Sequence, residues 1–267
     1  MPNDGGYLRV TAEEYNSIPN DYRKYFKKFV GSSEIINNKL KYCLWLYDQT
    51  DKRYLTNSFI VKRISEVKKY RLSSKRAATR KLAETPELFG EVRWEPSDST
   101  ILIPAFSSEN RLYVPMVIVD NDVISSNKNY CIYNAALWLF GLLTSRMHMT
   151  WMRSVGGRLE TRYSYSSKLV YNTFPVPELS SRRKNEIEDL VWKILDIRDE
   201  EGGTLAELYG SPLAAKNPKP MNSRLKAAHE ELDQVVDRAY RDRPFKDDNE
   251  RLALLLDMYS KKVNEEK

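Results

Sequence analysis

The chain has 267 residues, of which 41% are hydrophobic and 30% are charged. This composition is typical of a folded protein and excludes a disordered tail. No window approaches the roughly 18 apolar residues of a membrane span, and the first residues resemble neither a signal nor a transit peptide. Cys43 and Cys131 are isolated in apolar or aromatic stretches, so we expect reduced core cysteines in a cytosolic protein.

The net charge of +6 is distributed unevenly along the chain. Residues 1–179 hold 26 Lys and Arg against 18 Asp and Glu, whereas residues 180–267 hold 17 against 19. A local positive excess attracts polyanions such as nucleic acid. The split therefore predicts a DNA-facing part followed by a structural part.

The first predicted elements lie in residues 9–47. Thr11 stands three residues before Glu14, which is the spacing of a capping box at the start of a short helix. The run KYCLWL at 41–46 is predicted to be a buried strand.

Residues 57–89 are predicted to form the most basic helix, which Pro86 ends. Between residues 62 and 82 it carries nine Lys and Arg and a single Glu. One interpretation is a solvated helix on the surface, and the other is a helix laid along a phosphate backbone. The charge excess favours the second interpretation. The candidate phosphate contacts are Lys68, Lys69, Arg71, Lys75 and Arg76.

Short β-branched or aromatic runs between residues 91 and 133 predict a small mixed or antiparallel sheet. A tight turn is expected at residues 120–122, between two of the strands. The predicted strands are residues 92–94, 100–104, 112–119, 122–125 and 129–133.

Helical spacing returns at residues 135–152 and is broken by Gly156 and Gly157. Residues 164–172 are polar and predicted to be irregular, and 174–177 form a stiff, proline-rich connector.

After Ser180 the chain is helical almost to its end. We expect a helix from residue 182, capped by Ser180 or Ser181 and stopped by Gly202 and Gly203. Further helices are expected at 204–210, 222–240 and 248–263, with a linker at 212–220. Asp233 and Asp237 are expected to be solvated on one helix face. The predicted fold is therefore α+β, a small mixed or antiparallel sheet flanked by helices, followed by an all-α C-terminal domain.

The segment from residue 107 to 177 mixes Arg, Tyr, Ser, Asn and His between short apolar runs. Arg and Lys neutralise phosphate, while Ser, Asn and Tyr donate or accept hydrogen bonds, so this mixture is typical of a surface that binds DNA.

Glu109 and Arg111 are the sharpest candidates in it. Two residues apart, both would project from one face, where Arg pairs with guanine and Glu accepts from cytosine N4. The alternative is a salt bridge between them that stabilises the turn. Ser107 and Ser108 are expected either to contact phosphate or to cap the same loop.

The helix that follows carries Met147, Met149, Trp151 and Met152, which are predicted core residues. Arg146 and Arg153, seven residues apart, share a face and are predicted to reach DNA. His148 is left open between a structural and a binding role.

A second reading loop is predicted around residues 158–172. Its arginine density favours DNA contact over the alternative, a polar loop that folds over the sheet. Its candidate residues are Arg158, Arg162, Tyr163, Tyr165, Ser166, Tyr171 and Asn172.

Several longer blocks carry a family resemblance over nearly the whole chain. They include SSENRLYVP at 107–115, FGLLTSRMHMTWMRSVGGRLETRYSYS at 140–166, VYNTFPVP at 170–177 and MNSRLKAAHEELDQVVDRAY at 221–240. These blocks resemble the MmeI / YeeA-like DNA methyltransferases of type II restriction-modification systems.

The resemblance implies a connector from a methyltransferase domain at residues 1–50, a target-recognition domain at 51–178 and a C-terminal helical domain at 179–267. It also implies N6-adenine methylation of a specific duplex sequence by the full-length enzyme, with S-adenosylmethionine as the methyl donor. The implied partners are double-stranded DNA and a methyltransferase domain, in cis or as a separate subunit, in the bacterial cytoplasm.

Catalytic motifs are missing from the sequence. An amino-methyltransferase needs an Asn/Asp-Pro-Pro-aromatic tetrapeptide around the flipped base, and no Pro-Pro pair occurs here. Nor is there a glycine-rich cofactor turn or a zinc-ligand cluster, and the Glu-x-Lys spacing at residues 66–68 is taken as coincidence. We expect a DNA-recognition chain that is catalytically silent alone, without its own cofactor or metal. The alternative is a protein-docking subunit or scaffold that does not read DNA. A third hypothesis is an enzyme with a catalytic site of a kind not recognised in the sequence.

Overall fold

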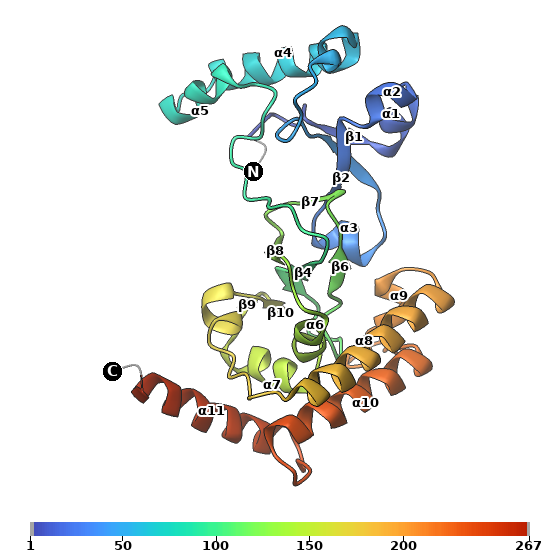
Figure 1. Cartoon of the computed structure of the whole chain (residues 1–267), viewed down its shortest axis with the longest axis vertical. Helices are drawn as coiled ribbons and strands as arrows, with labels where there is room; N and C mark the ends of the chain where they lie inside the picture. Colours follow the sequence, from blue (N-terminus) through green and yellow to red (C-terminus); the bar gives the residue numbers. More distant parts are fainter. Residues whose placement is uncertain (1–2, 266–267) are drawn as a thin grey trace. The chain divides into compact units, whose positions relative to one another are not determined.

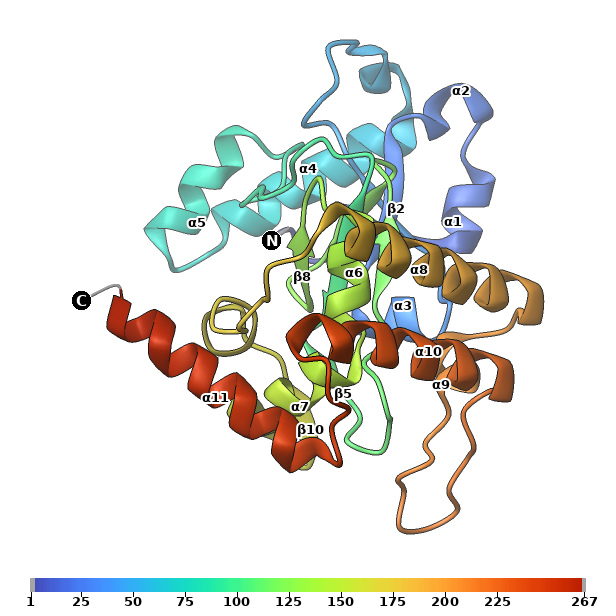
Figure 2. The ribbon, with the colours of Figure 1, turned by 60° about the horizontal axis from the view of Figure 1, so that its bottom comes forward.

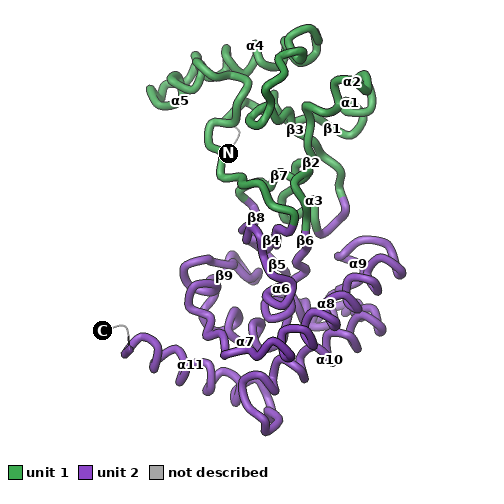
Figure 3. The backbone as a smooth tube through the Cα atoms, in the orientation of Figure 1, with its two compact units in different colours: residues 1–35, 39–98, 119–127 green, residues 36–38, 99–118, 128–267 purple. Residues whose placement is uncertain are grey.

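The computed structural model describes residues 3–265, which divide into two compact units (Figure 3). Unit 1 comprises the described residues up to Ile35, together with Lys39–Asp98 and Val119–Asn127. Unit 2 comprises Ile36–Asn38, Ser99–Ile118 and the described residues from Lys128 onward. None of the helices in residues 3–265 is long and apolar enough to cross a membrane.

Unit 1 is built on a mixed four-stranded sheet in the order β1-β3-β2-β7 (Figure 1). The β1–β3 and β3–β2 pairs are antiparallel, and β7 joins β2 in parallel. The predicted buried strand is confirmed at β3, where Cys43 and Leu44 are fully buried. The strands are β1 (Arg9–Thr11), β2 (Phe26–Val30), β3 (Lys41–Leu44) and β7 (Val123–Ser125).

Short helices flank this sheet. The predicted capping box is confirmed, since Thr11 and Glu14 exchange hydrogen bonds at the start of the first helix. These helices are α1 (Ala12–Ser17), α2 (Asn20–Arg23) and α3 (Ser32–Ile36).

The basic segment is not one helix up to residue 89, as predicted, but two helices with a break between them. Asn57 caps the first helix, which ends at Leu72. The guanidinium of Arg71 then donates to the carbonyls of Leu82, Thr85 and Leu88, so the chain folds back on the helix instead of extending it. The elements are η1 (Arg53–Thr56), α4 (Ser58–Leu72), α5 (Ala77–Lys81) and η2 (Leu82–Glu84).

Unit 2 contains two three-stranded sheets, ordered β6-β4-β8 and β5-β10-β9. The β4–β8 pair is antiparallel with Ile101 opposite Ile132, and β10 pairs antiparallel with both β5 and β9. The strands are β4 (Thr100–Pro104), β5 (Phe106–Ser107), β6 (Val117–Val119), β8 (Asn129–Ile132), β9 (Gly157–Leu159) and β10 (Arg162–Ser164).

Two predicted strands are wrong or too long. Residues 92–94 form no strand, and Trp94 packs edge-on against Trp45. Residues 112–116 are irregular as well: Pro115 has no N–H to donate, and the successive residues 113–116 are all buried, unlike a strand with one solvent face. The predicted turn is confirmed at Asp120, whose carboxylate accepts from the amide of Asp122.

The helix predicted at residues 135–152 is also two helices. Ser145 separates them: its hydroxyl donates to the carbonyl of Leu142 and accepts from the amide of His148. The predicted methionine and tryptophan core is confirmed, because all four side chains are at most 1% exposed. The helices of this region are α6 (Leu137–Leu143) and α7 (Arg146–Val155), and η3 (Ser167–Tyr171) is a π-helix in a segment predicted to be irregular.

The C-terminal part is helical as predicted, and α8 and α10 lie side by side in Figures 1 and 2. Ser180 caps α8 with its hydroxyl, and Asn222 caps α10. At Gly141 of α6 an added methyl group would lie 2.3 Å from Ile187 of α8, so a glycine is needed for this approach. The helices are α8 (Ser181–Glu201), α9 (Leu205–Tyr209), α10 (Ser223–Tyr240) and α11 (Asp248–Glu265).

Candidate nucleic-acid interface

The β5-β10-β9 sheet brings the two predicted reading segments together. Strands β9 and β10 form a hairpin whose turn contains Glu160, at a φ of 56°. Strand β10 also pairs with β5, so that Tyr163 lies opposite Ser107. The loop that begins at Ser107 and the arginine-rich hairpin are therefore neighbours, although about 50 residues separate them in the sequence.

Glu109 joins these two segments. Its carboxylate is hydrogen-bonded to the Thr161 side chain in the hairpin turn, which lowers the pKa of Glu109, and the charges of Arg158 and Arg162 lower it further. The carboxylate is therefore ionised and can only accept hydrogen bonds. The predicted alternative of a salt bridge to Arg111 is not formed among the described residues.

Arg111 lies on the same loop in a half-buried position. Its Nε atom is buried and has no hydrogen-bond partner within residues 3–265, and burial lowers the pKa of this guanidinium. A cation held in this way can still donate from its outer nitrogens to an acceptor that arrives from solvent.

The hairpin presents two exposed arginines. The guanidinium of Arg158 stacks over the ring of Tyr163, with 4.0 Å between the central carbon and the ring centroid. Arg162 forms an ion pair of 2.8 Å with Glu160, whose side chain is 76% exposed. Exposed pairs of this kind are weak, so Arg162 remains accessible to a phosphate.

Three further predicted contact residues lie inside the protein. Ser107, Tyr163 and Tyr165 are at most 7% exposed. The Tyr165 hydroxyl is 3.0 Å from Nε2 of His148, and the Tyr163 hydroxyl accepts from Arg153. This is a correction: because strand alternation turns these side chains inward, they support the hairpin and do not reach a ligand.

His148 takes the structural role that was left open. It is fully buried, and burial lowers its pKa to about 3, so the ring is neutral. Tyr171, which follows in η3, is half-buried, while Asn172 is exposed.

The two remaining serines cap local structure. The hydroxyl of Ser108 accepts from the amide of Asn110 within the loop. The hydroxyl of Ser166 accepts from the amide of Leu169 at the start of η3. Both side chains are half-buried.

Arg146 and Arg153 do share one face of α7, but a carboxylate occupies them both. Asp248, in the first turn of α11, contacts Nε of Arg146 at 2.7 Å and Nη1 of Arg153 at 3.5 Å. A phosphate would have to compete with this carboxylate for the two guanidinium groups.

The basic surface of α4 and α5 lies in unit 1. Lys68, Lys75 and Arg76 are exposed and form no ion pair within the described part of the chain, whereas Lys69 pairs with Glu66. Arg71 is 0% exposed. The burial of Arg71 removes it from the predicted phosphate contacts, since its guanidinium is taken up by backbone carbonyls.

Two side chains near the hairpin were not predicted from the sequence. Thr161 binds Glu109, and the Lys128 amino group lies 6.0 Å from the centroid of the Phe106 ring on β5. Recognising residues 157–164 as two short strands with a turn at residues 160 and 161 would have placed Thr161 in the hairpin turn.

The expectation for Asp233 and Asp237 is also corrected. Asp233 is buried and accepts from the Tyr113 hydroxyl and from the amide of Arg146. Asp237 holds the guanidinium of Arg251 in a two-point contact. Both carboxylates face other elements of unit 2, so neither is a solvated group.

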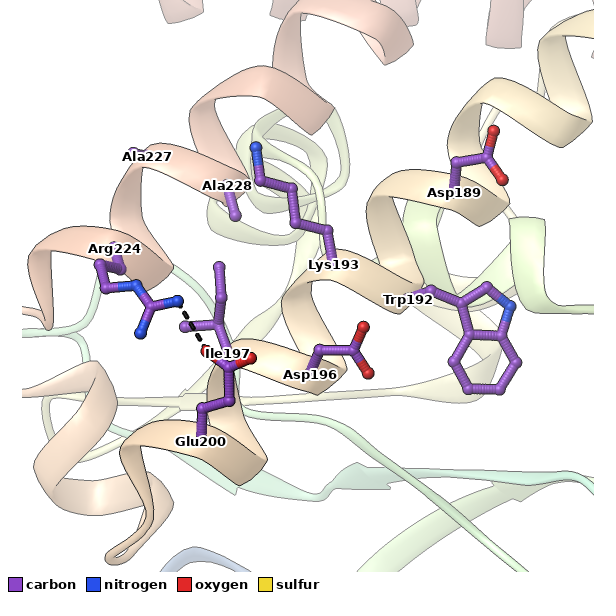
Figure 4. Close-up of a pocket in the computed structure, with 9 residues that line it drawn as sticks. All are labelled: Asp189, Trp192, Lys193, Asp196, Ile197, Glu200, Arg224, Ala227 and Ala228. Atoms are coloured by element: carbon purple, nitrogen blue, oxygen red, sulfur yellow. Dashed lines mark hydrogen bonds and ion pairs between the residues drawn. The ribbon is translucent and has the colours of Figure 1, made fainter.

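A groove between α8 and α10 has a volume of about 510 Å³ (Figure 4). Asp189, Asp196 and Glu200 line it along α8, and Arg224 turns toward Glu200 in an ion pair of 2.7 Å. Lys193 also lines the groove, so cations and carboxylates are mixed there, unlike the acid-poor surface around Lys68, Lys75 and Arg76.

Residues 1–178 match the family model of the MmeI target recognition domain, and residues 179–265 match that of the MmeI C-terminal domain. The chain belongs to the MmeI family. The family resemblance and the α+β fold class predicted from the sequence are thereby confirmed.

Two relatives are similar over nearly the whole chain. DNA methyltransferase A of Bacillus subtilis (strain 168) is 51% identical over 262 residues, which cover 97% of this chain and 29% of the relative. A solved structure of the type IIL restriction-modification enzyme MmeI in complex with DNA has a TM-score of 0.87 and 40% identity, and the match covers 99% of this chain and 35% of MmeI. The chain thus spans about a third of the length of these relatives.

Proposed function

We propose that this chain recognises a specific duplex-DNA sequence for an N6-adenine DNA methyltransferase of a restriction-modification system, and that it is catalytically silent alone. One observation carries the proposal: the loop with Glu109 and Arg111 and the hairpin with Arg158 and Arg162 form one surface through the β5-β10-β9 sheet. The family membership, and a relative whose solved structure contains DNA, support it.

The base-reading role falls to Glu109 and Arg111. An ionised carboxylate matches the cytosine N4 amino donor, and guanidinium donors match guanine O6 and N7. The low pKa of Glu109 keeps it in the accepting form. Together they suit one G·C base pair.

The phosphate-contacting role falls to exposed cations on two surfaces, one in each compact unit. In unit 1 these are Lys68 of α4 with Lys75 and Arg76 of the turn before α5, and on the hairpin they are Arg158 and Arg162. Accessible cations release counterions from DNA when they bind, which gives affinity without sequence preference.

The remaining proposals concern the parent enzyme. A methyltransferase domain, in cis or as a separate subunit, would bind S-adenosylmethionine and methylate adenine in the bacterial cytoplasm. In this scheme residues 1–50 connect to that domain, 51–178 recognise the target, and 179–267 form the C-terminal helical domain.

A second candidate function is protein docking without DNA reading. It is favoured by Trp192, which is 58% exposed at the groove between α8 and α10 (Figure 4). Exposed tryptophans are frequent anchors of protein interfaces. Partner binding would then depend little on salt.

Selection of bound sequences from a randomised duplex library tests the proposal, together with the salt dependence of the preferred duplex. We expect an enriched motif and an affinity that falls steeply with salt. Steep salt dependence without enrichment would show that specificity requires the methyltransferase part. No binding at low salt would refute DNA recognition by this chain and favour docking.

Variants of the loop assign the base contact. Glu109→Gln and Arg111→Ala should change the preference at one base pair by about 1–3 kcal/mol. Glu160→Gln, which removes an exposed acid from the adjoining hairpin, is the matched control and should leave the motif unchanged. If the motif is the same in all three variants, the base-reading assignment is wrong.

A further inference from the structure

The loop that begins at Ser107 and carries Glu109 and Arg111 is here called the recognition loop, and residues 110–116 are its return segment. This return segment is irregular, so neighbouring strands do not fix its position. The C-terminal region holds it at both ends instead. The amide of Leu213 donates to the carbonyl of Asn110 over 3.0 Å, and the buried guanidinium of Arg198 donates to the carbonyl of Met116 over 2.9 Å. Arg111 lies inside this clamped segment, and Glu109 directly precedes it.

The centre of the segment is fixed by a buried carboxylate. Asp233 of α10 accepts from the Tyr113 hydroxyl over 2.7 Å and from the amide of Arg146 over 2.6 Å. Asp233 is 7% exposed and Tyr113 is 5% exposed. One side chain of the C-terminal helices therefore ties the return segment to the start of α7.

A second contact orders the ring of Tyr113. It stacks on the ring of His229 with centroids 4.3 Å apart, and Nε2 of His229 lies 2.9 Å from the Tyr209 hydroxyl. Tyr209 in turn accepts from Arg198, the residue that holds Met116. The contacts at residues 113 and 116 thus belong to one buried polar network contributed by α8, α9 and α10.

We propose that this network is a positioning device for sequence recognition: Tyr113 and Asp233 set the place of Glu109 and Arg111 relative to the hairpin. The proposal rests on the proposed DNA-reading function. The buried hydrogen bonds from Tyr113 to Asp233 and from Arg198 to Met116 favour one arrangement of the segment, because a buried polar group that loses its partner raises the free energy. Apolar side chains at residues 113 and 233 would be enough to pack the C-terminal domain, so stability alone does not require this polar pair.

Tyr113→Phe is the direct test, with Tyr240→Phe as the matched control. Each change removes one hydroxyl that donates a hydrogen bond in unit 2, in the control to the carbonyl of Pro175 over 2.8 Å. The affinities of both variants are measured for the selected duplex and for duplexes with one altered base pair. Melting temperatures are recorded alongside.

We expect Tyr113→Phe to reduce discrimination about tenfold at the base pair assigned to Glu109 and Arg111, which corresponds to about 1.4 kcal/mol. Affinity for unrelated duplex should stay within about twofold. Tyr240→Phe should lower the melting temperature similarly but leave discrimination unchanged. Equal discrimination by the two variants, or a uniform loss at every base pair, would overturn the proposal.

Hydrogen exchange provides a readout that needs no DNA. Tyr113→Phe and Asp233→Asn should both accelerate amide exchange in residues 108–116 about tenfold, relative to the original chain and to Tyr240→Phe. Unchanged exchange in this segment would refute the positioning role. If the original chain selects no DNA motif while exchange responds as expected, the proposed function is wrong. The role of Tyr113 and Asp233 in positioning residues 108–116 is then still supported.

Discussion

Two groups of cations have the same residue types in opposite surroundings: the first is Lys68 of α4 with Lys75 and Arg76 between α4 and α5, and the second lies along α10 and α11. Lys68, Lys75 and Arg76 are exposed and hold no carboxylate among the residues that the structure describes. Along α10 and α11, in contrast, most cations are bound in ion pairs with carboxylates, including Arg224, Lys226, Arg241, Arg251 and Lys261.

The exposed cations are available to bind a ligand, whereas the paired cations stabilise the fold; we call the second kind framework residues. A paired cation must lose its carboxylate before it binds phosphate, whereas an unpaired one only releases counterions. The overall charge of +6 conceals the distinction, because it counts both kinds equally. Substitutions that remove either exposed or paired cations test this distinction.

The largest effect is expected at Arg71, a framework residue within the basic segment. Arg71→Ala should lower the free energy of unfolding by about 3 kcal/mol or more, because several buried carbonyls lose their donor at about 1–3 kcal/mol each. Chemical denaturation measures this. Lys68→Ala, which alters an exposed neighbour, should stay within about 0.5 kcal/mol. Equal stability of the two variants would contradict the structural assignment of Arg71.

The triple change Lys68→Ala, Lys75→Ala and Arg76→Ala should lower affinity about 100-fold on every duplex at physiological salt. The slope of log affinity against log salt should fall by about 3, since each phosphate contact contributes about 0.9. Titrations at several salt concentrations measure both quantities.

The matched control for that triple change removes three paired lysines, Lys193, Lys226 and Lys261. It lowers the net charge equally. Similar losses in both triple variants would mean that total charge, and not the surface of α4 and α5, determines binding.

Asp233 should make stability depend on pH. Burial raises its pKa from the ordinary 3.8 to about 7, although the hydrogen bonds from Tyr113 and Arg146 oppose the shift. Between about pH 4 and pH 7 the unfolded chain releases a proton that the folded chain keeps, so the free energy of unfolding falls as pH rises. Asp233→Asn should remove this slope, which is about 1.4 kcal/mol per pH unit inside the window.

Denaturation at pH 4.5, 6 and 7.5 measures the Asp233 effect. Asp189→Asn, an exposed acid on α8, serves as the control and should keep the slope. A slope that persists in Asp233→Asn would show that another group titrates in this range.

The smallest effect is expected on the hairpin. Arg158→Ala and Arg162→Ala should each weaken binding about fivefold on all duplexes and reduce the salt slope by about 1. Arg146→Ala is the comparison, because Asp248 already holds that guanidinium. If Arg146→Ala weakens binding as much as Arg158→Ala, an ion pair with a carboxylate does not prevent an arginine from binding DNA.

Local signals in the sequence predicted much of the fold. Thr11 and Glu14 form their capping box, and α8 is capped by Ser180, one of the two serines predicted for that role. These features succeed because they depend on residues three or four apart. The long helices expected at 57–89 and 135–152 failed because Arg71 and Ser145 redirect the chain, the first through contacts with residues up to 17 positions away.

The candidate site was predicted in composition but not in geometry. The sequence placed Glu109, Arg158 and Arg162 among the binding residues, and the structure groups them. It also placed Tyr163, Tyr165 and Arg71 there, and these are buried. Composition cannot distinguish an arginine that faces solvent from one that binds carbonyls, because the difference lies in elements distant along the chain.

Residue identities and short spacings were enough to predict the family resemblance, the α+β class and several helix starts, and they show the uneven distribution of charge. Each is set by residue identity or by neighbours within one helical turn. Three other features depend on contacts between elements that are distant along the chain: β10 joins the two reading segments, Asp248 pairs with Arg146 and Arg153, and Asp233 binds Tyr113. The last of these contacts spans 120 residues, and its carboxylate is placed by the packing of α10 and not by any local pattern.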